Sequence, residues 1–454
     1  MTREQFETEF NSRTIAYHPD YRSDDRPVVI VVGGAADSEP GHVLAVALVN
    51  LLARAHRRIA VVGDLHRPLR CFDHFRLGTL HGATVGLASA INPFIDITAG
   101  GRAPDGNRLL TIGTAADGDL RLGCDGWTAV TGGGAEVDPR RTSILGAALA
   151  ACLGAGTAFH RLIGADEKPV GHFSLWDYAR ASTAQGPEVT GRLDVGRVLQ
   201  VGAGAVGCAL DFWLGFLGWL GHWIVADGDI VAVSNLNRQL LFVALDAGFP
   251  DRQATTKAET VIKRLGGQMT ASPHWYGEDQ AVIDASYDLV LALANEHGVR
   301  PALQSRPQTV LLHSTTTRSW KAIAHRHVAG HDDCIVCRLP SEENSLFACS
   351  TASVGTQARM DASLPFLSGL AGLLLLGDVI RLQCGRLLDR ATNFASVDLS
   401  TPVPFVRELT WECRTKCRVR MPGAARARRT KGTRFADLDG DLEAQDYGTA
   451  KASR

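Results

Sequence analysis

Two stretches of the chain repeat the same order of hydrophobic and polar positions. Residues 26–64 begin with an apolar run, pass through a glycine turn into a segment with helical periodicity, and end with a second apolar run. Residues 197–229 repeat this order. A buried strand, a glycine turn, a helix and a second strand form the start of a doubly wound α/β unit. The pattern therefore predicts an α/β fold with two Rossmann-like halves in one chain.

Segments of a different character separate and follow these halves. Residues 165–195 are predicted to connect them, because turn-forming residues are frequent in the second part of this stretch. This places a first domain at residues 1–180 and a second at residues 181–420. In residues 421–454 the hydrophobic periodicity vanishes and a basic run precedes an acidic one, which predicts a mostly disordered tail.

Composition and charge exclude several classes of protein. The 454 residues are 45% hydrophobic and 21% charged, and the formal net charge of −1 gives no reason to expect a nucleic-acid partner. The first ten residues lack the apolar core of a signal peptide. The longest apolar run, residues 364–380, is short for a membrane span and is predicted to be a buried core helix. We therefore expect a cytoplasmic protein that does not bind membranes.

A nucleotide site is predicted in the second half only. Gly202, Gly204 and Gly207 form a G-x-G-x-x-G directly after an apolar strand and before a helix, where free N–H groups can bind a phosphate. Asp227 follows at the end of the next strand, where a carboxylate can accept hydrogen bonds from ribose hydroxyls. The first half has no such motif. These features alone do not distinguish NAD from ATP.

Cations close to this motif favour a triphosphate. The segment "DGDIVAVSNLNRQLLF" (227–242) carries Arg238, and Lys257 follows it. A nicotinamide site needs an open apolar slot, whereas arginine and lysine can stabilise a triphosphate that loses negative charge in a transition state. The alternative is that both side chains are solvated helix residues.

The same segment, with "GAGAVG" upstream and Lys257 downstream, resembles the ThiF/MoeB-type adenylating superfamily, which includes the activating enzymes of ubiquitin and ubiquitin-like proteins. The resemblance covers about residues 195–420. It implies ATP and Mg²⁺ as cofactors. The nucleotide-contacting residues that it implies are Asp227, Asp229, Asn235, Arg238, Gln239 and Lys257.

The resemblance also implies roles for these residues. Asp227 would bind the ribose, and Asn235 and Arg238 would contact the triphosphate. Gln239 would support them, and Lys257 would stabilise the departing pyrophosphate.

One position departs from the family pattern. The family places a magnesium-binding acid after the strand that reads "DLVLALANEHGVR" (288–300) in this chain, but Asn295 stands there, with Glu296 next to it. A neutral amide oxygen is a weaker ligand than a carboxylate. Either Glu296 replaces the missing acid, which is the interpretation that we prefer, or adenylation is impaired.

Four of the ten cysteines predict a structural zinc site. Cys334 and Cys337 have C-x-x-C spacing, and Cys413 and Cys417 form a second close pair. Two such thiolate pairs can close a tetrahedral site with no open position. Activating enzymes have a similar layout, so the zinc would staple the crossover segment of the second half. Unrelated free thiols are the alternative.

Cys349 lies outside both pairs, in "FACSTASVG" (347–355). An acyl-adenylate is reactive enough for a nearby thiolate to capture the acyl group as a thioester, and the hydroxylated neighbours favour an accessible thiol. Activating enzymes similarly place their catalytic cysteine between the first zinc pair and a long apolar helix. The segment near residues 338–363 would then carry the nucleophile. A core thiol and an accessory to the metal site are the alternatives.

Together these features predict a pseudo-dimer with an inactive first half and an active second half. The resemblance implies that the carboxylate of a ubiquitin-like protein is adenylated at the second glycine loop, with Arg238 and Lys257 as catalytic groups. Cys349 would then form a thioester for transfer to a conjugating enzyme. The first half would lend an arginine across the interface, with Arg180 as a weakly supported candidate. Two chains could also associate as a homodimer. By analogy alone, such a system would be bacterial and could serve antiviral defence.

Three other functions remain open at this point. The same adenylation could serve sulfur transfer or peptide modification, without a protein thioester. Asn295 raises the possibility of a catalytically weakened scaffold. An NAD-dependent oxidoreductase is the third alternative.

Overall fold

The computed structural model describes residues 1–18, 21, 27–100, 108–112, 120–137, 143–164, 171–181, 186–189, 191–294, 298–306, 310–329, 331–338, 363–401, 403–413, 417, 434, 435 and 438.

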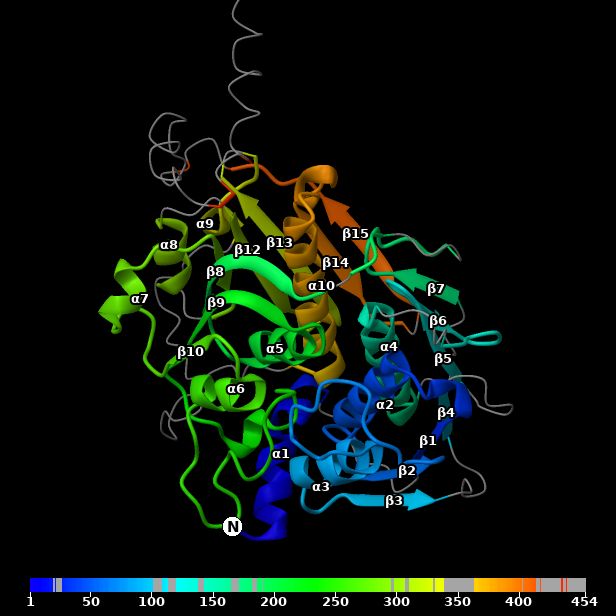
Figure 1. Cartoon of the computed structure of the whole chain (residues 1–454). Helices are drawn as coiled ribbons and strands as arrows, with labels where there is room; N and C mark the ends of the chain where they lie inside the picture. Colours follow the sequence, from blue (N-terminus) through cyan, green and yellow to red (C-terminus); the bar gives the residue numbers. More distant parts are fainter. Residues whose placement is uncertain are drawn as a thin grey trace, which may run out of the picture.

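The first sheet is formed by the N-terminal part of the chain (Figure 1). Its strands are β1 (Val28–Val32), β2 (Arg58–Val62), β3 (Asp96–Gly100), β4 (Arg108–Ile112), β5 (Leu120–Asp125), β6 (Thr128–Thr131) and β7 (Gly171–Ser174). They lie in the order β3-β2-β1-β4-β5-β6-β7. The pairs from β3 to β5 are parallel, and β6 and β7 continue the sheet as antiparallel strands.

The second sheet repeats this order. Its strands are β8 (Leu193–Val201), β9 (Trp219–Ala226), β10 (Met269–Ser272), β11 (Leu289–Ala292), β12 (Val310–Thr316), β13 (Lys321–Val328), β14 (Phe394–Asp398) and β15 (Phe405–Leu409). They lie in the order β10-β9-β8-β11-β12-β13-β14-β15, parallel as far as β12 and antiparallel beyond it. The prediction of two Rossmann-like α/β halves is confirmed.

Helices cover both sheets. The α-helices are α1 (Arg3–Tyr17), α2 (Glu39–Leu52), α3 (Leu87–Ile91), α4 (Leu145–Leu162), α5 (Ala205–Leu217), α6 (Lys257–Leu265), α7 (Gln280–Asp284), α8 (Val299–Gln304), α9 (Ile335–Arg338) and α10 (Pro365–Gln383). Short 3-10 or π-helical turns are η1 (Gly34–Ala36), η2 (Gly82–Gly86), η3 (Val233–Asn235) and η4 (Leu387–Asp389).

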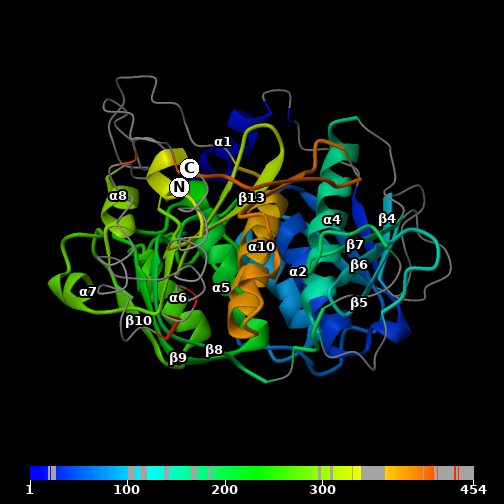
Figure 2. The same ribbon diagram turned by 90° about the horizontal axis from the view of Figure 1, so that it is seen from above.

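A layer of helices between the two sheets joins the halves. Figure 2 shows α5 and α10 of the second half beside α2 and α4 of the first, with the strands on either side. α10 packs against α5 and α4, and α4 packs against α2. A Cβ added at Gly372 of α10 would lie 2.6 Å from the backbone nitrogen of Leu210 in α5, so this close approach requires glycine. The two halves therefore share one apolar core.

The two longest apolar helices belong to this shared layer. α4 and α10 are long and apolar enough to cross a membrane. However, 94% of the most apolar stretch of α4 and 100% of that of α10 are buried inside the fold. A fully buried leucine contributes roughly 2 kcal/mol through burial of its side chain. The prediction of a buried core helix at residues 364–380 is confirmed.

One sequence prediction needs correction. Residues 165–195 were expected to be a connection, but they contain β7, which pairs with β6 through the short and partly polar sequence "GHFS". In the segment predicted to be a disordered tail, the backbone N–H of Arg434 donates to Asp288 Oδ1 at 2.8 Å, and Leu438 O contacts His331 Nε2 at 2.8 Å. These two tail residues contact the second half, and the mostly disordered tail stays a prediction because the other residues of 421–454, apart from Phe435, lie outside the described residues.

Candidate nucleotide and metal sites

The glycine loop of the second half connects β8 to α5. Gly202 has a φ of +106°, and a Cβ there would lie 2.7 Å from the backbone nitrogen of Ala294. A Cβ on Gly207 would lie 2.2 Å from the carbonyl oxygen of Gly202. Gly204 has no atom within 4 Å of where a Cβ would stand. The outer glycines thus permit the tight turn and helix packing, and Gly204 leaves open space in front of the helix N-terminus.

Asp227 anchors this loop to the next strand. Its Oδ2 accepts a hydrogen bond from the backbone N–H of Ala203 at 2.7 Å, and its Oδ1 accepts one from the N–H of Asp229 at 2.9 Å. Burial raises the pKa of Asp227, and the positive charge of Lys257 opposes this shift. The carboxylate therefore stands beside the glycine loop, where the sequence predicted a ribose contact.

Lys257 is the first residue of α6 and points back toward this acid. Its Nζ donates to Asp229 Oδ2 at 2.5 Å, and its backbone N–H donates to Asp229 O at 2.9 Å. The two side chains are only 6% and 14% exposed. Asp229 therefore holds the lysine in place near Asp227, and a nucleotide phosphate would compete with Asp229 for the ammonium group.

We call residues 233–242 the phosphate segment, because it contains the remaining predicted contacts. Asn235 Oδ1 accepts from the backbone N–H of Ala232 at 3.0 Å. Arg238 donates to Ser234 O at 2.5 Å and to Asn237 Oδ1 at 3.0 Å. These bonds fold the segment into a turn.

The residues Asn235, Arg238 and Gln239 are 2%, 8% and 2% exposed. The predicted residues are therefore fixed within the fold rather than solvated.

The first half contributes α1 to this site, which the sequence did not predict. Thr14 Oγ1 accepts from Asn237 Nδ2 at 3.0 Å, and Glu9 Oε1 accepts from the backbone N–H of Ser234 at 3.4 Å. Arg13, next to Thr14, is buried. No pattern in the sequence predicts this contact, because its partners are more than two hundred positions apart.

Arg180, the arginine that the sequence proposed, lies elsewhere. It is exposed and follows Ala179, whose carbonyl accepts from Ser174 of β7. Arg381, near the C-terminal end of α10, donates to Leu175 O at 2.7 Å in this same region. The carboxyl edge of the second sheet lies at the opposite end of α10, where Thr316 of β12 bonds to Ser363. Arg180 therefore lies near the end of α10 that is opposite to the nucleotide loop.

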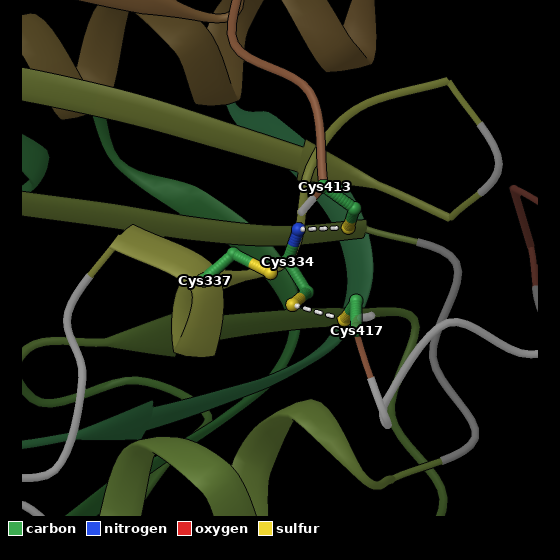
Figure 3. A group of neighbouring side chains, drawn as sticks. All are labelled: Cys334, Cys337, Cys413 and Cys417. Atoms are coloured by element: carbon green, nitrogen blue, oxygen red, sulfur yellow. Dashed lines mark hydrogen bonds between the residues drawn. The ribbon is translucent and has the colours of Figure 1, made fainter. Parts of the chain in front are cut away.

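The four paired cysteines come together in space (Figure 3). Cys334 Sγ lies 3.4 Å from Cys417 Sγ, the backbone N–H of Cys334 points at Cys413 Sγ at 3.2 Å, and all four sulfurs lie within 4.8 Å of one another. A tetrahedral zinc with bonds of about 2.3 Å holds its sulfurs about 3.8 Å apart, so the group fits this ion.

Burial raises the pKa values of the Cys334 and Cys413 thiols when no cation is present. A divalent cation would compensate the buried thiolates, so the donor set fits a structural zinc.

A network of polar side chains fixes the start of this cysteine cluster. Asp333, directly before Cys334, accepts from His325 Nε2 at 2.9 Å and from Asn393 Nδ2 at 3.1 Å. Its carbonyl accepts from His327 Nδ1 at 2.9 Å. The histidines and Asp333 could themselves bind a metal by proximity, but these hydrogen bonds already account for their arrangement. They position the backbone at Cys334 as supports of the cluster.

Three predicted residues cannot be placed. Asn295, Glu296 and Cys349 lie outside the described residues. Ala294, directly before Asn295, is described and borders Gly202. Their predicted roles stay predictions.

Comparison with known proteins agrees with this division of the chain. The model of the ThiF family matches residues 178–419, which is more than half of the chain. The model of the BilD N-terminal domain matches residues 27–172.

Two curated relatives are similar over parts of their lengths. The uncharacterized protein y4jF from Sinorhizobium fredii (strain NBRC 101917 / NGR234) is 27% identical over 360 residues, which are 74% of this chain and 65% of that protein. The SAMP-activating enzyme E1 from Haloferax volcanii is 35% identical over 88 residues, which are 19% of this chain and 31% of that enzyme.

Among solved structures, E. coli MccB with ATP matches with a TM-score of 0.40 and 15% identity, covering 66% of this chain and 98% of that chain. A similarity at this level carries no functional argument. The ThiF match spans the glycine loop, the acids after β9 and all four clustered cysteines. The chain belongs to the ThiF family, within the ThiF/MoeB-type adenylating superfamily.

Proposed function

We propose that this chain is an activating enzyme that adenylates the C-terminal carboxylate of a ubiquitin-like protein. The observation that carries the proposal is the gathering of Asp227, Asp229 and Lys257 beside the glycine loop of the second half. Members of the ThiF family are ATP-dependent adenylating enzymes, and the local similarity to a SAMP-activating enzyme supports a protein as substrate. A cytoplasmic setting is part of the proposal.

The adenylation step transfers AMP to the carrier. A carboxylate oxygen of the carrier attacks the α-phosphorus of ATP, the new C(O)O–P bond forms, and the bond from the α-phosphorus to the bridging oxygen breaks. Pyrophosphate leaves with the electron pair of that bond. Lys257, released from Asp229, and Arg238 would stabilise the negative charge that develops on the leaving group. Magnesium, when bound through Glu296 or Asn295, would neutralise part of the triphosphate charge.

The second step is the capture of the acyl group by Cys349. Its thiolate attacks the carbonyl carbon of the mixed anhydride, the carbon–oxygen bond to the phosphate breaks, and AMP leaves. A conjugating enzyme's cysteine would accept the acyl group by a further thioester exchange. The zinc ligands Cys334, Cys337, Cys413 and Cys417 would fix the start of the segment that carries this nucleophile.

Carrier-dependent ATP–pyrophosphate exchange tests the first step. The protein is mixed with a candidate ubiquitin-like protein, and exchange is expected in the wild type and lost in Lys257→Ala. The control Lys321→Ala changes a lysine on β13 that pairs with Asp398, away from the glycine loop. No exchange with any carrier would contradict the enzyme proposal and favour a scaffold.

A non-reducing gel tests the second step. The wild type with carrier and ATP is expected to give an adduct that dithiothreitol removes and that Cys349→Ala lacks. Exchange without such an adduct would instead indicate a sulfur-carrier or peptide adenylyltransferase, in which sulfide, a persulfide or an amine captures the adenylate.

A further inference from the structure

We propose that Asn50 and Arg54, on and just after helix α2 of the first half, position the phosphate segment of the second half for the triphosphate. The inference rests on the proposed nucleotide site of the second half. It adds a role for the first half, in which no nucleotide site is predicted. Both side chains are fully buried, and they come from a helix that lies directly against the second half (Figure 2).

Hydrogen bonds link these two side chains to three carbonyl groups. Arg54 Nη2 donates to Leu240 O at 2.9 Å and to Phe242 O at 3.2 Å, and Arg54 Nη1 donates to Leu236 O. Asn50 Nδ2 donates to Leu240 O at 3.0 Å. Arg54 Nε donates to Asn50 Oδ1 at 2.8 Å, which fixes the two side chains relative to each other. We call this arrangement the α2 clamp.

The carbonyl groups bound by the α2 clamp flank the predicted triphosphate contacts. Leu236 and Leu240 lie on either side of Arg238 and Gln239. From Leu236 to Thr256 the chain forms neither regular helix nor strand, and the carbonyl groups of Leu236, Leu240 and Phe242 accept their hydrogen bonds from the α2 clamp. A buried carbonyl group that loses its hydrogen-bond donor destabilises the conformation that buries it. The α2 clamp therefore holds the conformation that presents Arg238 to a phosphate.

Arg54 also places a positive charge beneath the site. No carboxylate among the described residues lies within ion-pair distance of it, and burial lowers the pKa of Arg54 to about 9, so it stays charged at neutral pH. The thiol of Cys208, which follows Gly207 of the glycine loop, lies close enough to interact electrostatically with Arg54. The buried cation of Arg381, by contrast, pairs with Asp378 at 2.7 Å. A bound triphosphate would supply the negative charge that Arg54 lacks.

The pseudo-symmetry of the chain allows α2 to be compared with its matching helix in the second half, α5. Gly41 and Gly207 occupy matching positions in the two units, because each would place a Cβ 2.2 Å from a carbonyl of its preceding turn. Counting from these glycines within the helices, Asn50 of α2 corresponds to Phe216 of α5, whose apolar side chain cannot donate a hydrogen bond. Among the described residues, α5 therefore lacks the amide that α2 uses in the clamp.

The experiment compares nucleotides with different numbers of phosphates. The dissociation constants of ATP and adenosine are measured by equilibrium dialysis for the wild type, Arg54→Met, Arg54→Lys and Asn50→Ala. In Arg54→Met we expect ATP binding to weaken by about tenfold, because the phosphate segment loses the hydrogen bonds that hold it, while adenosine binding stays unchanged. Arg54→Lys should recover most of the affinity, and Asn50→Ala should show a smaller loss.

The control is Ile59→Ala, which removes a buried side chain from β2 of the first half without touching the phosphate segment. Its melting temperature falls, but its ATP affinity should match the wild type. If Arg54→Met does not fold, amide hydrogen exchange is measured in Asn50→Ala instead. Residues 233–242 should then exchange faster in this variant than in the wild type. Equal ATP affinity in Arg54→Met and the wild type, or an equal loss for adenosine, would overturn the α2 clamp alone. A wild type that binds no ATP would overturn the proposed function together with it.

Discussion

The carboxyl edges of the two sheets differ at the residue that follows the second strand of each unit. In the second half this residue is Asp227, whose backbone N–H donates to the carbonyl of Ser272, the last residue of β10. In the first half it is Gly63, whose φ is +138° and whose N–H donates in the same way to the carbonyl of Gly100, the last residue of β3. The backbone frame is therefore the same, but the first half lacks the carboxylate that the second half uses to anchor its loop. Sharing a Rossmann-like sheet does not by itself make a nucleotide site.

The turns before α2 and α5 differ as well. In the second half, residues 202–204 lead directly from β8 into the helix, whereas residues 33–38 fill this place in the first half. There Asp37 pairs with Arg70 at 2.7 Å and with Arg67 at 3.5 Å. In the first half, ion pairs between side chains of the same half thus occupy the carboxyl edge of the sheet. The first half has kept the helix packing and the contacts that support the second half.

The largest expected effect concerns the cysteine cluster, because among the described residues only the second half has one. Cys334→Ser is expected to release one zinc per chain and to lower the free energy of unfolding by roughly 4 kcal/mol, since a structural metal contributes directly to folding. Metal analysis and urea denaturation measure both quantities. Cys384→Ser, at an exposed cysteine, is the control. A Cys334→Ser protein that keeps its zinc and its stability would contradict the assignment.

The next effect separates the acids of the two halves. Asp227→Ala is expected to lower ATP–pyrophosphate exchange by roughly a hundredfold, because it removes both the predicted ribose contact and the anchor of the glycine loop. Asp64→Ala, at an exposed acid after β2 that pairs with Arg67, is the matched change in the first half and should leave exchange unaltered. Equal losses in both variants would show that the first half also takes part in nucleotide binding.

The smallest effect concerns Asp211 of α5, whose counterpart in α2, counted from Gly41, is Ala45. Burial raises the pKa of Asp211 to about 8, and its Oδ2 accepts from Gln200 Nε2 at 2.9 Å. The folded state therefore binds this proton more tightly than the unfolded chain does. The contribution of this group to the free energy of unfolding is fully present below the pKa that Asp211 has in the unfolded chain. It is lost as the pH rises toward 8.

Asp211→Asn should accordingly gain stability over the wild type as pH rises. Between pH 5 and pH 8 we expect the difference in unfolding free energy to widen by at least about 1 kcal/mol, measured by urea denaturation at each pH. Ala45→Ser in α2 serves as the control from the first half and should show no such pH dependence. A constant difference would mean that Asp211 is ionised in the fold.

How much the sequence predicted depends on the range of the interaction. The glycine loop and Asp227 belong to one strand–helix–strand unit, so their proximity follows from local pattern alone. The cysteine pairs were found through spacing and metal chemistry, although they lie far apart in sequence. The contacts of Thr14, Asn50 and Arg54 with the phosphate segment had no such signature. They depend on how the two halves pack, which periodicity does not specify. β7 was missed because a short, partly polar edge strand carries little hydrophobic pattern.

The central claim is that one chain has one working nucleotide site, located in the second half and supported by the first. Equilibrium dialysis with radiolabelled ATP measures the number of nucleotides bound per chain. The wild type and Asp64→Ala should each bind one ATP, and Asp227→Ala should bind none at the same concentration. Two bound nucleotides per wild-type chain, or one retained by Asp227→Ala, would contradict it.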